Sequence, residues 1–323
     1  MNYAIVGCGL IGKKRCAGLP AGSRLTIACD TDPARAQELV KFAQSGRALT
    51  DFHQAVTDPT VDAVIVATVN SALAEVSAAA IRAGKHVLVE KPAGISVREI
   101  DGLIELASRH NVRVRVGFNH RYHPAFTKAR EIFSTGVMGE LMFLRARYGH
   151  GGRIGYDQEW RADPKLSGGG ELIDQGIHLI DLARWFLGEF EKIEGHTATY
   201  FWKMPVEDNA FLSLQTASGQ TAWLHASCTE WKNLFSFELY GRHAKLHIEG
   251  LGGSYGVEKL FHHQMKPEMG IPDTQVYEFP GPDESWRHEL TQFEEDIRQE
   301  RSPDAGLADT RAALRIVAEI YRK

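Results

Sequence analysis

The sequence predicts an α/β protein of two domains. The first is a doubly wound parallel sheet, and the second is an α+β domain with a large open, mostly antiparallel sheet. Over the first 120 residues short apolar runs alternate with helical stretches, and between about residues 191 and 249 apolar and polar residues alternate in strand-like runs. A chain of 323 residues is also long for a single core. We therefore expect domains at 1–120 and 121–323.

The composition is that of an ordinary globular protein, with 43% hydrophobic and 24% charged residues. A formal net charge of -4 and a pI near 6.4 give no general attraction to nucleic acid or to an anionic membrane. The four cysteines show no C-x-x-C spacing, so neither a zinc site nor a disulfide framework is expected. No charged leader and no apolar run of about 18–20 residues is found. We expect a cytoplasmic protein without a metal.

The first apolar run, residues 3–6, leads directly into Gly7-Cys-Gly-Leu-Ile-Gly12 and then into a helix near Lys13. Such glycines permit a tight strand-to-helix turn and let the backbone approach a pyrophosphate. A second strand, 25–29, ends at Asp30, where a carboxylate would accept hydrogen bonds from a ribose and repel a 2′-phosphate. NAD is therefore favoured over NADP, although Arg35 lies close enough to shield that charge. The dinucleotide-binding residues expected here are Gly7, Gly9, Leu10, Ile11, Gly12, Asp30 and Arg35.

Two further strands of this domain end in polar residues. The run 63–67 ends at Thr68 and Asn70, and the run 86–89 delivers Glu90-Lys91-Pro92. Ligands of open parallel sheets lie outside the carboxyl ends of the strands, so Lys91 is a candidate ligand contact. A solvated loop lysine is the other interpretation. A helix near 97–110 and a strand at 113–117 complete the domain.

The second domain contains the most chemically suggestive stretch, residues 167–188, which is expected to be a glycine-rich entry followed by a helix of about five turns. Asp174, His178 and Asp181 stand four and then three residues apart, so a regular helix places them on one face. The remaining surface of that helix is apolar. One interpretation is that the two carboxylates satisfy a core histidine, since unpaired buried polar groups are costly. The other is a catalytic site in which Asp181 fixes the imidazole tautomer.

Several strands follow this helix and predict the antiparallel sheet. Their expected ranges are 191–203, 208–217, 220–229, 234–241 and 244–249, with Gly241-Arg242 as a hairpin turn. Trp223 and, where the register turns them outward, Phe235 and Phe237 would form a subunit interface. Residues 251–285 are expected to be loops with one strand near 275–279. The other predicted elements are a helix near 124–135, a strand near 141–148, and helices near 284–300 and 306–322.

With these residues described, the chain resembles the Gfo/Idh/MocA family of glucose–fructose oxidoreductases, inositol dehydrogenases and rhizopine-catabolism proteins. The likeness spans essentially the whole length. It rests on four motifs in order: Gly7–Gly12, Glu90-Lys91-Pro92, Gly117-Phe-Asn-His-Arg-Tyr-His-Pro124, and Trp160-Arg161 with Gly168-Gly-Gly-x-x-x-Asp174-x-Gly-x-His178-x-x-Asp181. Val69 and Leu73 depart from the proline and histidine that members often carry there.

The resemblance implies an N-terminal Rossmann domain, and it implies that Lys91, Asp174 and His178 are the catalytic residues. Further cofactor contacts implied in this way are Thr68, Asn70, Glu90, Lys91, Asn119, Trp160 and Arg161. His178 suits proton exchange because an imidazole titrates near neutrality, and Lys91 is the second candidate for that role. The expected substrate-binding residues are Lys91, Arg121, Tyr122, Arg153, Tyr156, Asp174 and His178, a set rich in hydrogen-bond donors.

These features predict hydride transfer between nicotinamide and a ring carbon of a sugar, with a nucleotide-linked sugar as the leading substrate. A free sugar or inositol dehydrogenase, an NAD-dependent glycosidase and a non-catalytic nucleotide-sensing regulator are the alternatives. The expected partners are the small-molecule substrate and further copies of the chain in a homodimer or homotetramer, with no nucleic acid and no membrane.

Overall fold

The computed structural model describes residues 1–322, which divide into two compact units. The first unit contains Met1–Phe118, Lys165–Gly168 and Trp286–Arg315, and the second contains Asn119–Pro164, Gly169–Ser285 and the stretch from Ile316 onward. The break after Phe118 lies near the boundary expected at residue 120. The division at 120 had assigned Trp286–Arg315 to the other part of the chain, because proximity in sequence does not reveal which core a helix joins.

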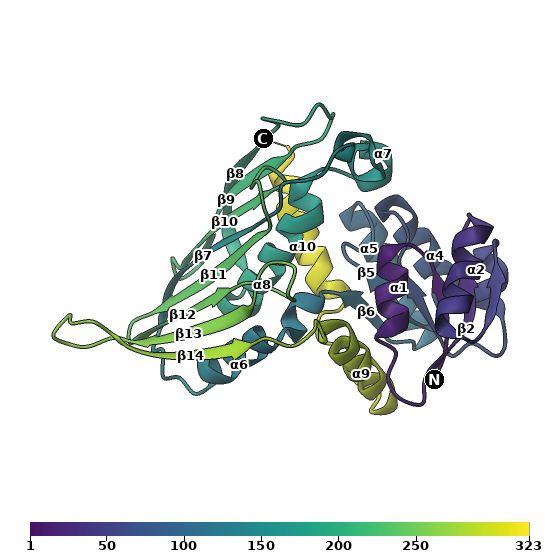
Figure 1. Cartoon of the computed structure of the whole chain (residues 1–323), viewed down its shortest axis with the longest axis horizontal. Coiled ribbons are helices and arrows are strands. Elements are labelled where there is room, and N and C mark those ends of the chain that lie inside the picture. The colour runs from purple at the N-terminus through teal and green to yellow at the C-terminus, as the bar shows by residue number, and fades with distance from the viewer. Residues whose placement is uncertain (323) are drawn as a thin grey trace. The chain divides into compact units, whose positions relative to one another are not determined.

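A six-stranded parallel sheet with strand order β3-β2-β1-β4-β5-β6 forms the centre of the first unit (Figure 1). Its strands are β1 (Asn2–Val6), β2 (Arg24–Cys29), β3 (Arg47–Leu49), β4 (Ala63–Val66), β5 (His86–Glu90) and β6 (Val114–Gly117). Its helices are α1 (Leu10–Ala17), α2 (Pro33–Ala43), α3 (Phe52–Thr57), α4 (Asn70–Arg82), α5 (Val97–His110), α9 (Ser285–Arg298) and most of α10 (Leu307–Ile320). The predicted Rossmann-type sheet is confirmed. Strand β3 and helix α3 were not predicted, because no periodic pattern marks them in the sequence.

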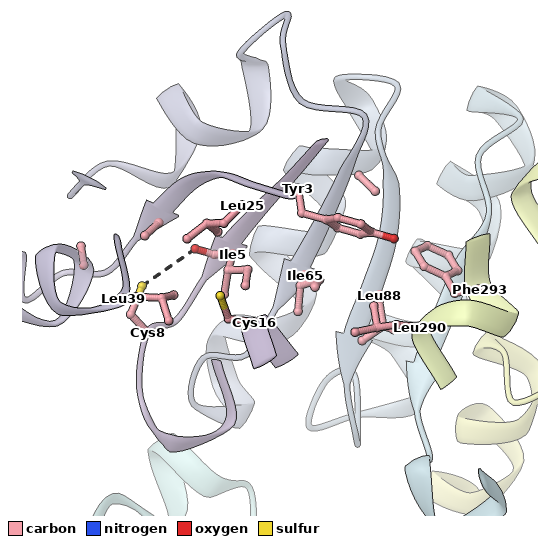
Figure 2. Close-up of a cluster of buried hydrophobic side chains, with 13 residues drawn as sticks. Tyr3, Ile5, Cys8, Cys16, Leu25, Leu39, Ile65, Leu88, Leu290 and Phe293 are labelled. Carbon is pink, nitrogen blue, oxygen red and sulfur yellow. Dashed lines mark hydrogen bonds between the residues drawn. The ribbon is translucent and has the colours of Figure 1, made fainter. Parts of the chain in front are cut away.

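The core of the first unit shows why α9 belongs there. Tyr3 and Ile5 point to one face of the sheet, as the two-residue period of a strand requires. Figure 2 shows Leu290 and Phe293 of α9 in the same cluster, and both are fully buried. Burying a large apolar side chain contributes about 1.5–3 kcal/mol, so these two residues alone give α9 a strong preference for this core. The Tyr3 hydroxyl also donates to Glu294 at 3.0 Å.

The second unit is built on an eight-stranded sheet with strand order β14-β13-β12-β11-β7-β10-β9-β8. Among the described residues β7 and β10 form its one parallel pair, and the other neighbours are antiparallel. The strands are β7 (Leu141–Gly149), β8 (Phe190–Ala198), β9 (Asn209–Thr216), β10 (Thr221–Ser227), β11 (Leu234–Gly241), β12 (Ala244–Glu249), β13 (Glu258–Gln264) and β14 (Asp273–Phe279). The predicted open antiparallel sheet is therefore confirmed. Strand β13 was wrongly expected to be a loop.

Helices α6 (Pro124–Ser134) and α8 (Ile177–Leu187) pack against this sheet (Figure 1). Phe235 and Phe237 lie on the packed face, where Phe237 contacts Phe126 of α6 with ring centroids 5.1 Å apart. The register turns both rings inward, so the condition under which they would join an exposed interface is not met. The alternation of a strand does not by itself reveal which face meets the helices. Trp223 is 61% exposed and lies on the opposite face.

The remaining elements of the second unit are short. They are the 3₁₀ turns η1 (Asn119–Tyr122), η2 (Tyr156–Gln158) and η3 (Trp160–Ala162), and the π-helical turn η4 (Leu172–Gly176), which runs directly into α8. The short helix α7 (Pro164–Ser167) lies between η3 and η4 in the sequence and belongs largely to the first unit. No helix within residues 1–322 is both long and apolar enough to cross a membrane.

Candidate functional site

The glycine loop between β1 and α1 has the shape that a dinucleotide requires. Gly7 has φ +95°, and a Cβ there would lie 2.3 Å from the Ala67 carbonyl oxygen. A Cβ on Gly12 would lie 2.1 Å from the Gly7 carbonyl oxygen. Gly9, by contrast, faces open space at the start of α1, where the first N–H groups of the helix are available to phosphate oxygens. The loop therefore fits a pyrophosphate at Gly9, with Leu10 and Ile11 in the first helical turn.

Asp30 follows β2 and braces this loop. One carboxylate oxygen accepts the Cys8 backbone N–H at 2.8 Å, and the other accepts the Asp32 backbone N–H at 2.9 Å. Arg35 is mostly exposed and forms a loose pair with Asp32, 3.5 Å apart. Asp30 thus has a structural task that the sequence did not reveal, in addition to the ribose contact proposed for it.

Two other expected cofactor residues lie at the ends of β4 and β5. The Asn70 amide donates to the Ser167 carbonyl at 2.9 Å, and the Thr68 hydroxyl donates to the Val69 carbonyl at 3.2 Å. Glu90 is buried and accepts from Arg15 Nε at 2.6 Å. Lys91, which follows it, is half-buried. The carboxylate of Glu90 therefore serves the fold of this unit.

Asp174 lies in the π-helical turn of the second unit, and such turns are frequent at functional sites. Its carboxylate accepts from Arg161 Nε at 3.0 Å, and the Arg161 guanidinium lies 4.5 Å from the Trp160 ring centroid. The turn itself is fixed by Glu207, whose carboxylate accepts the backbone N–H groups of Gly170 and Leu172, both at 3.0 Å. The result is a rigid carboxylate with a cationic neighbour.

His178 lies in α8 and is buried against another imidazole. The ring centroids of His178 and His120 are 3.8 Å apart. Tyr148, at the end of β7, lies next to both rings, with centroids 5.1 Å from His120 and 6.2 Å from His178. Tyr148 also shares a hydrogen bond with Tyr255. Burial raises the pKa of both phenols, so they stay protonated and can donate hydrogen bonds at neutral pH.

Asp181, one turn beyond His178 on α8, is bound by Arg121. Its carboxylate accepts two hydrogen bonds from Arg121, from Nε at 2.8 Å and from Nη2 at 2.5 Å. The role of Asp181 in fixing the imidazole tautomer stays a prediction. The Arg121 guanidinium is buried with both arms engaged, and its contact with substrate stays a prediction.

The remaining expected substrate residues have partners of their own within the second unit. Tyr156 is buried and donates to Glu171 at 2.8 Å, while Arg153 is mostly exposed and pairs with Glu159 at 2.7 Å. His150 lies near the same buried carboxylate, 3.8 Å from Glu171. Burial lowers the pKa of His150, which keeps its imidazole neutral near pH 7. Tyr156 is buried in η2 and Tyr122 is half-buried in η1, and the substrate contacts expected of both stay predictions.

The structure adds Tyr148 and Tyr255 to the site and shows the contacts of two residues of the Gly117–Pro124 motif. Asn119, expected to bind cofactor, is buried and donates to Ser285 at 2.9 Å, while its neighbour His120 contacts His178 directly. Tyr148 was not identified from the sequence, because as the penultimate residue of a strand it carries no functional motif. Tyr255 lies in a glycine-rich segment without periodicity, so no sequence signal pointed to it.

In comparison with known proteins, both parts of the chain match models of the same family. Residues 1–118 match a model described as an oxidoreductase family with an NAD-binding Rossmann fold, and residues 126–247 match the GFO/IDH/MocA C-terminal domain. The expected NAD-binding character of the first part of the chain is thereby confirmed at the level of the family.

Curated relatives match over about two thirds of the chain. Levoglucosan dehydrogenase of Pseudarthrobacter phenanthrenivorans is 26% identical over 239 residues, and inositol 2-dehydrogenase 2 of Saccharopolyspora erythraea is 30% identical over 226 residues. Each alignment covers 68% of this chain. The chain spans 59% and 64% of the length of these two relatives.

A solved structure of levoglucosan dehydrogenase in complex with NADH superimposes on this fold with a TM-score of 0.90. The match covers 100% of this chain and 96% of that chain at 21% identity. A structure of GenD2 from gentamicin A biosynthesis in complex with NAD gives a TM-score of 0.86 at 23% identity, covering 100% of this chain and 93% of that chain. At these identities the likeness establishes the fold.

Proposed function

We propose, because this chain belongs to the Gfo/Idh/MocA oxidoreductase family, that it is an NAD-dependent dehydrogenase acting on a ring hydroxyl of a sugar or inositol. The observation that carries this proposal is the arrangement on the segment from η4 to α8. It holds Asp174 against Arg161 and His178 against His120. A buried imidazole and a fixed carboxylate four residues apart are suited to exchanging a hydroxyl proton.

The first unit would hold the cofactor with its own backbone and one carboxylate. The N–H groups at the start of α1 would bind the pyrophosphate at Gly9, and Asp30 would accept from the adenosine ribose. When bound, the nicotinamide supplies the hydride acceptor. A carboxylate at position 30 would repel a 2′-phosphate, which favours NAD over NADP.

Three side chains would act on the substrate, each in a different role. His178 accepts that proton as the carbinol carbon is oxidised, because an imidazole titrates near neutrality. Lys91 polarises the same oxygen with its ammonium group. Asp174, held by Arg161, accepts a hydrogen bond from a neighbouring ring hydroxyl and so fixes which carbon reacts.

The chemistry of the site supports an uncharged polyol more than a nucleotide-linked sugar. A diphosphate needs available cations, yet Arg121 is committed to Asp181 and Arg153 to Glu159. The named activities of the two curated relatives, on levoglucosan and on inositol, agree with an uncharged ring. The sequence predicted a nucleotide-linked sugar, so sugar nucleotides are included in the substrate screen as the second candidate class.

The test is a screen of levoglucosan, free sugars, inositols and sugar nucleotides with NAD⁺, followed by absorbance at about 340 nm. With the substrate found, Lys91→Ala and His178→Ala are each expected to lower turnover by about 10²–10⁴. NADH affinity should change much less, and His110→Ala, at the exposed end of α5, is the matched control for loss of an imidazole. Near-native turnover of both site variants would refute the proton-transfer roles, and hydrolysis of a glycoside without net absorbance change would identify a glycosidase.

We also propose that the exposed face of the eight-stranded sheet joins two copies of the chain. Stacked aromatic pairs line this face, with the ring centroids of Phe143 and Tyr240 4.2 Å apart and those of Phe211 and His225 4.3 Å apart. Trp223 borders a hollow of about 370 Å³ on the same face. An exposed face of this kind is typical of a self-complementary interface.

A further inference from the structure

The turn that carries Lys91 has a fixed backbone within the first unit. Strand β5 ends at Glu90, and the Ala93 backbone N–H donates to the Glu90 carbonyl at 2.8 Å, which closes a turn over Glu90–Ala93. Ala93 has φ +68° and a fully buried side chain. A non-glycine residue keeps such a conformation only where its surroundings enforce it. The residues that enforce it come from the far end of the chain.

The first anchor of the Glu90–Ala93 turn acts on the side chain of Glu90. Arg15 of α1 is fully buried, and its Nε donates to Glu90 at 2.6 Å. The other arm of this guanidinium, Nη1, donates to Glu289 of α9 at 2.5 Å. The Cζ atom of Arg15 lies 4.6 Å from the centroid of the Trp286 ring. Two carboxylates thus share one cation away from solvent. Because Glu289 fixes the orientation of Arg15, it also fixes Glu90.

The second anchor acts on the backbone of the same turn. The hydroxyl of Thr310, a fully buried residue of α10, donates to the Pro92 carbonyl at 2.8 Å. The segment around Thr310 is itself attached to the sheet and to α5. The Val116 N–H donates to the Ala305 carbonyl at 2.9 Å, and Arg311 pairs with Asp101 at 2.5 Å. The position of Thr310 is therefore not free to follow the turn.

We infer that Glu289 and Thr310 are positioning residues for Lys91. Each holds one flank of the residue whose ammonium group acts on the substrate hydroxyl, and the inference rests on the proposed function in that respect. A displacement of about 1 Å at a reacting group can lower a rate by about 10²-fold, so loosening either flank has a kinetic effect. The nicotinamide dinucleotide is bound by the glycine loop and Asp30, so its affinity depends little on these two residues.

The test uses the full chain with three variants. Thr310→Val removes the hydroxyl at nearly constant volume, Thr310→Ser restores it, and Glu289→Gln removes the shared charge. Thr291→Val is the matched control, because the Thr291 hydroxyl bonds only to the Arg287 carbonyl of its own helix α9 among the contacts described, at 2.9 Å. Two kinds of measurement are made on each folded variant. The first is turnover with levoglucosan or myo-inositol and NAD⁺ alongside NADH affinity. The second is the labelling rate of Lys91 by an amine-reactive reagent, followed by mass spectrometry.

Thr310→Val and Glu289→Gln are expected to lower turnover at least tenfold, with NADH affinity changing less than threefold, and to raise Lys91 labelling at least threefold. Thr310→Ser and Thr291→Val should stay within twofold of the parent. Lys85 is the internal labelling control, since its ammonium donates to the Asp58 and Val61 carbonyls in the same unit.

Unchanged Lys91 labelling in both folded variants overturns the inference, and so does unchanged turnover where Lys91→Ala abolishes it. If Glu289→Gln does not fold, Thr310→Val decides alone. If Lys91→Ala keeps full turnover, the proposed catalytic role of Lys91 fails, while the labelling result still decides whether these residues position the turn.

Discussion

The guanidinium of Arg121 and the carboxylate of Asp181 form a two-armed ion pair inside the second unit, with Asp181 one helical turn beyond His178. Both side chains are almost completely buried, at 3% and 1% exposed. The pair joins η1 to α8, so it fixes the neighbour of Arg121, His120, against His178. The helical spacing had suggested that Asp181 serves His178. In the structure Asp181 holds η1 and α8 together.

Breaking this pair is expected to be strongly destabilising. Asp181→Asn leaves the Arg121 charge buried without its ionic partner, which should lower the free energy of unfolding by about 3–5 kcal/mol. Urea unfolding at pH 7 measures the effect. Glu140→Gln is the control, because the ion pair of Glu140 with Arg242 is exposed and should contribute little. A loss below about 1 kcal/mol in Asp181→Asn would contradict the buried-pair account.

Gly170 and Gly102 are expected to respond oppositely to the same added methyl group. A Cβ on Gly170 would lie 2.0 Å from the Glu207 carbonyl oxygen, so Gly170→Ala should destabilise the protein by about 1–3 kcal/mol. Gly102 is an exposed residue within α5 and meets nothing within 4 Å. Gly102→Ala should therefore stabilise the protein by about 0.5–1 kcal/mol. Urea unfolding of both variants provides the comparison, and equal stabilities would refute it.

Asp208 is expected to contribute stability that is lost in acid. Burial by itself would raise its pKa, but hydrogen bonds from Asn209 and from the backbone N–H groups of Phe201, Tyr200 and Trp202 lower it below the ordinary value. A carboxyl with a lowered folded-state pKa stabilises the protein above its unfolded pKa of about 3.9, and that stability disappears as pH falls through the folded value.

Asp208→Asn should accordingly lower the free energy of unfolding at pH 7 by about 1.5–3 kcal/mol, the contribution of hydrogen bonds to a charged group. The difference from the parent should shrink as pH falls below about 4. Urea unfolding at pH 7, 5, 4 and 3 measures both quantities. Asp273→Asn, at an exposed residue paired with Lys266, should show little effect at any of these values. A pH-independent difference would show that Asp208 acts only through packing.

Trp223→Glu is expected to weaken self-association through the exposed sheet face. A charge placed on that face would have to be desolvated when two copies meet. Sedimentation at micromolar concentration should show the parent as a dimer or tetramer and the variant shifted toward monomer. Trp231→Glu makes the same change at an exposed tryptophan outside the strands and should behave like the parent. A parent that sediments as a monomer would rule out the proposed interface.

Much of the architecture was predictable because it depends on local patterns. Three features are encoded within a few neighbouring residues each: the glycine loop, the acid at the end of β2 and the alternation in β10. Strands β3 and β13 were missed for the same reason, since β3 has only three residues and β13 alternates weakly within a segment rich in Gly and His. Asp174 and His178 were identified as site residues, but their partners Arg161 and His120 were not paired with them.

The sequence by itself determined the two-unit α/β plan, the dinucleotide loop and the family, because these rest on period-two and glycine patterns that short stretches carry. Only the tertiary structure decided that Asp181 belongs to Arg121, that Phe235 and Phe237 face the helices, and that Glu289 and Thr310 reach the turn around Lys91. These are choices among chemically equivalent partners. They are decided by packing between residues that lie 60 to more than 200 positions apart in the sequence. In that packing every buried charge needs a partner and every buried ring must fit its neighbours at the same time.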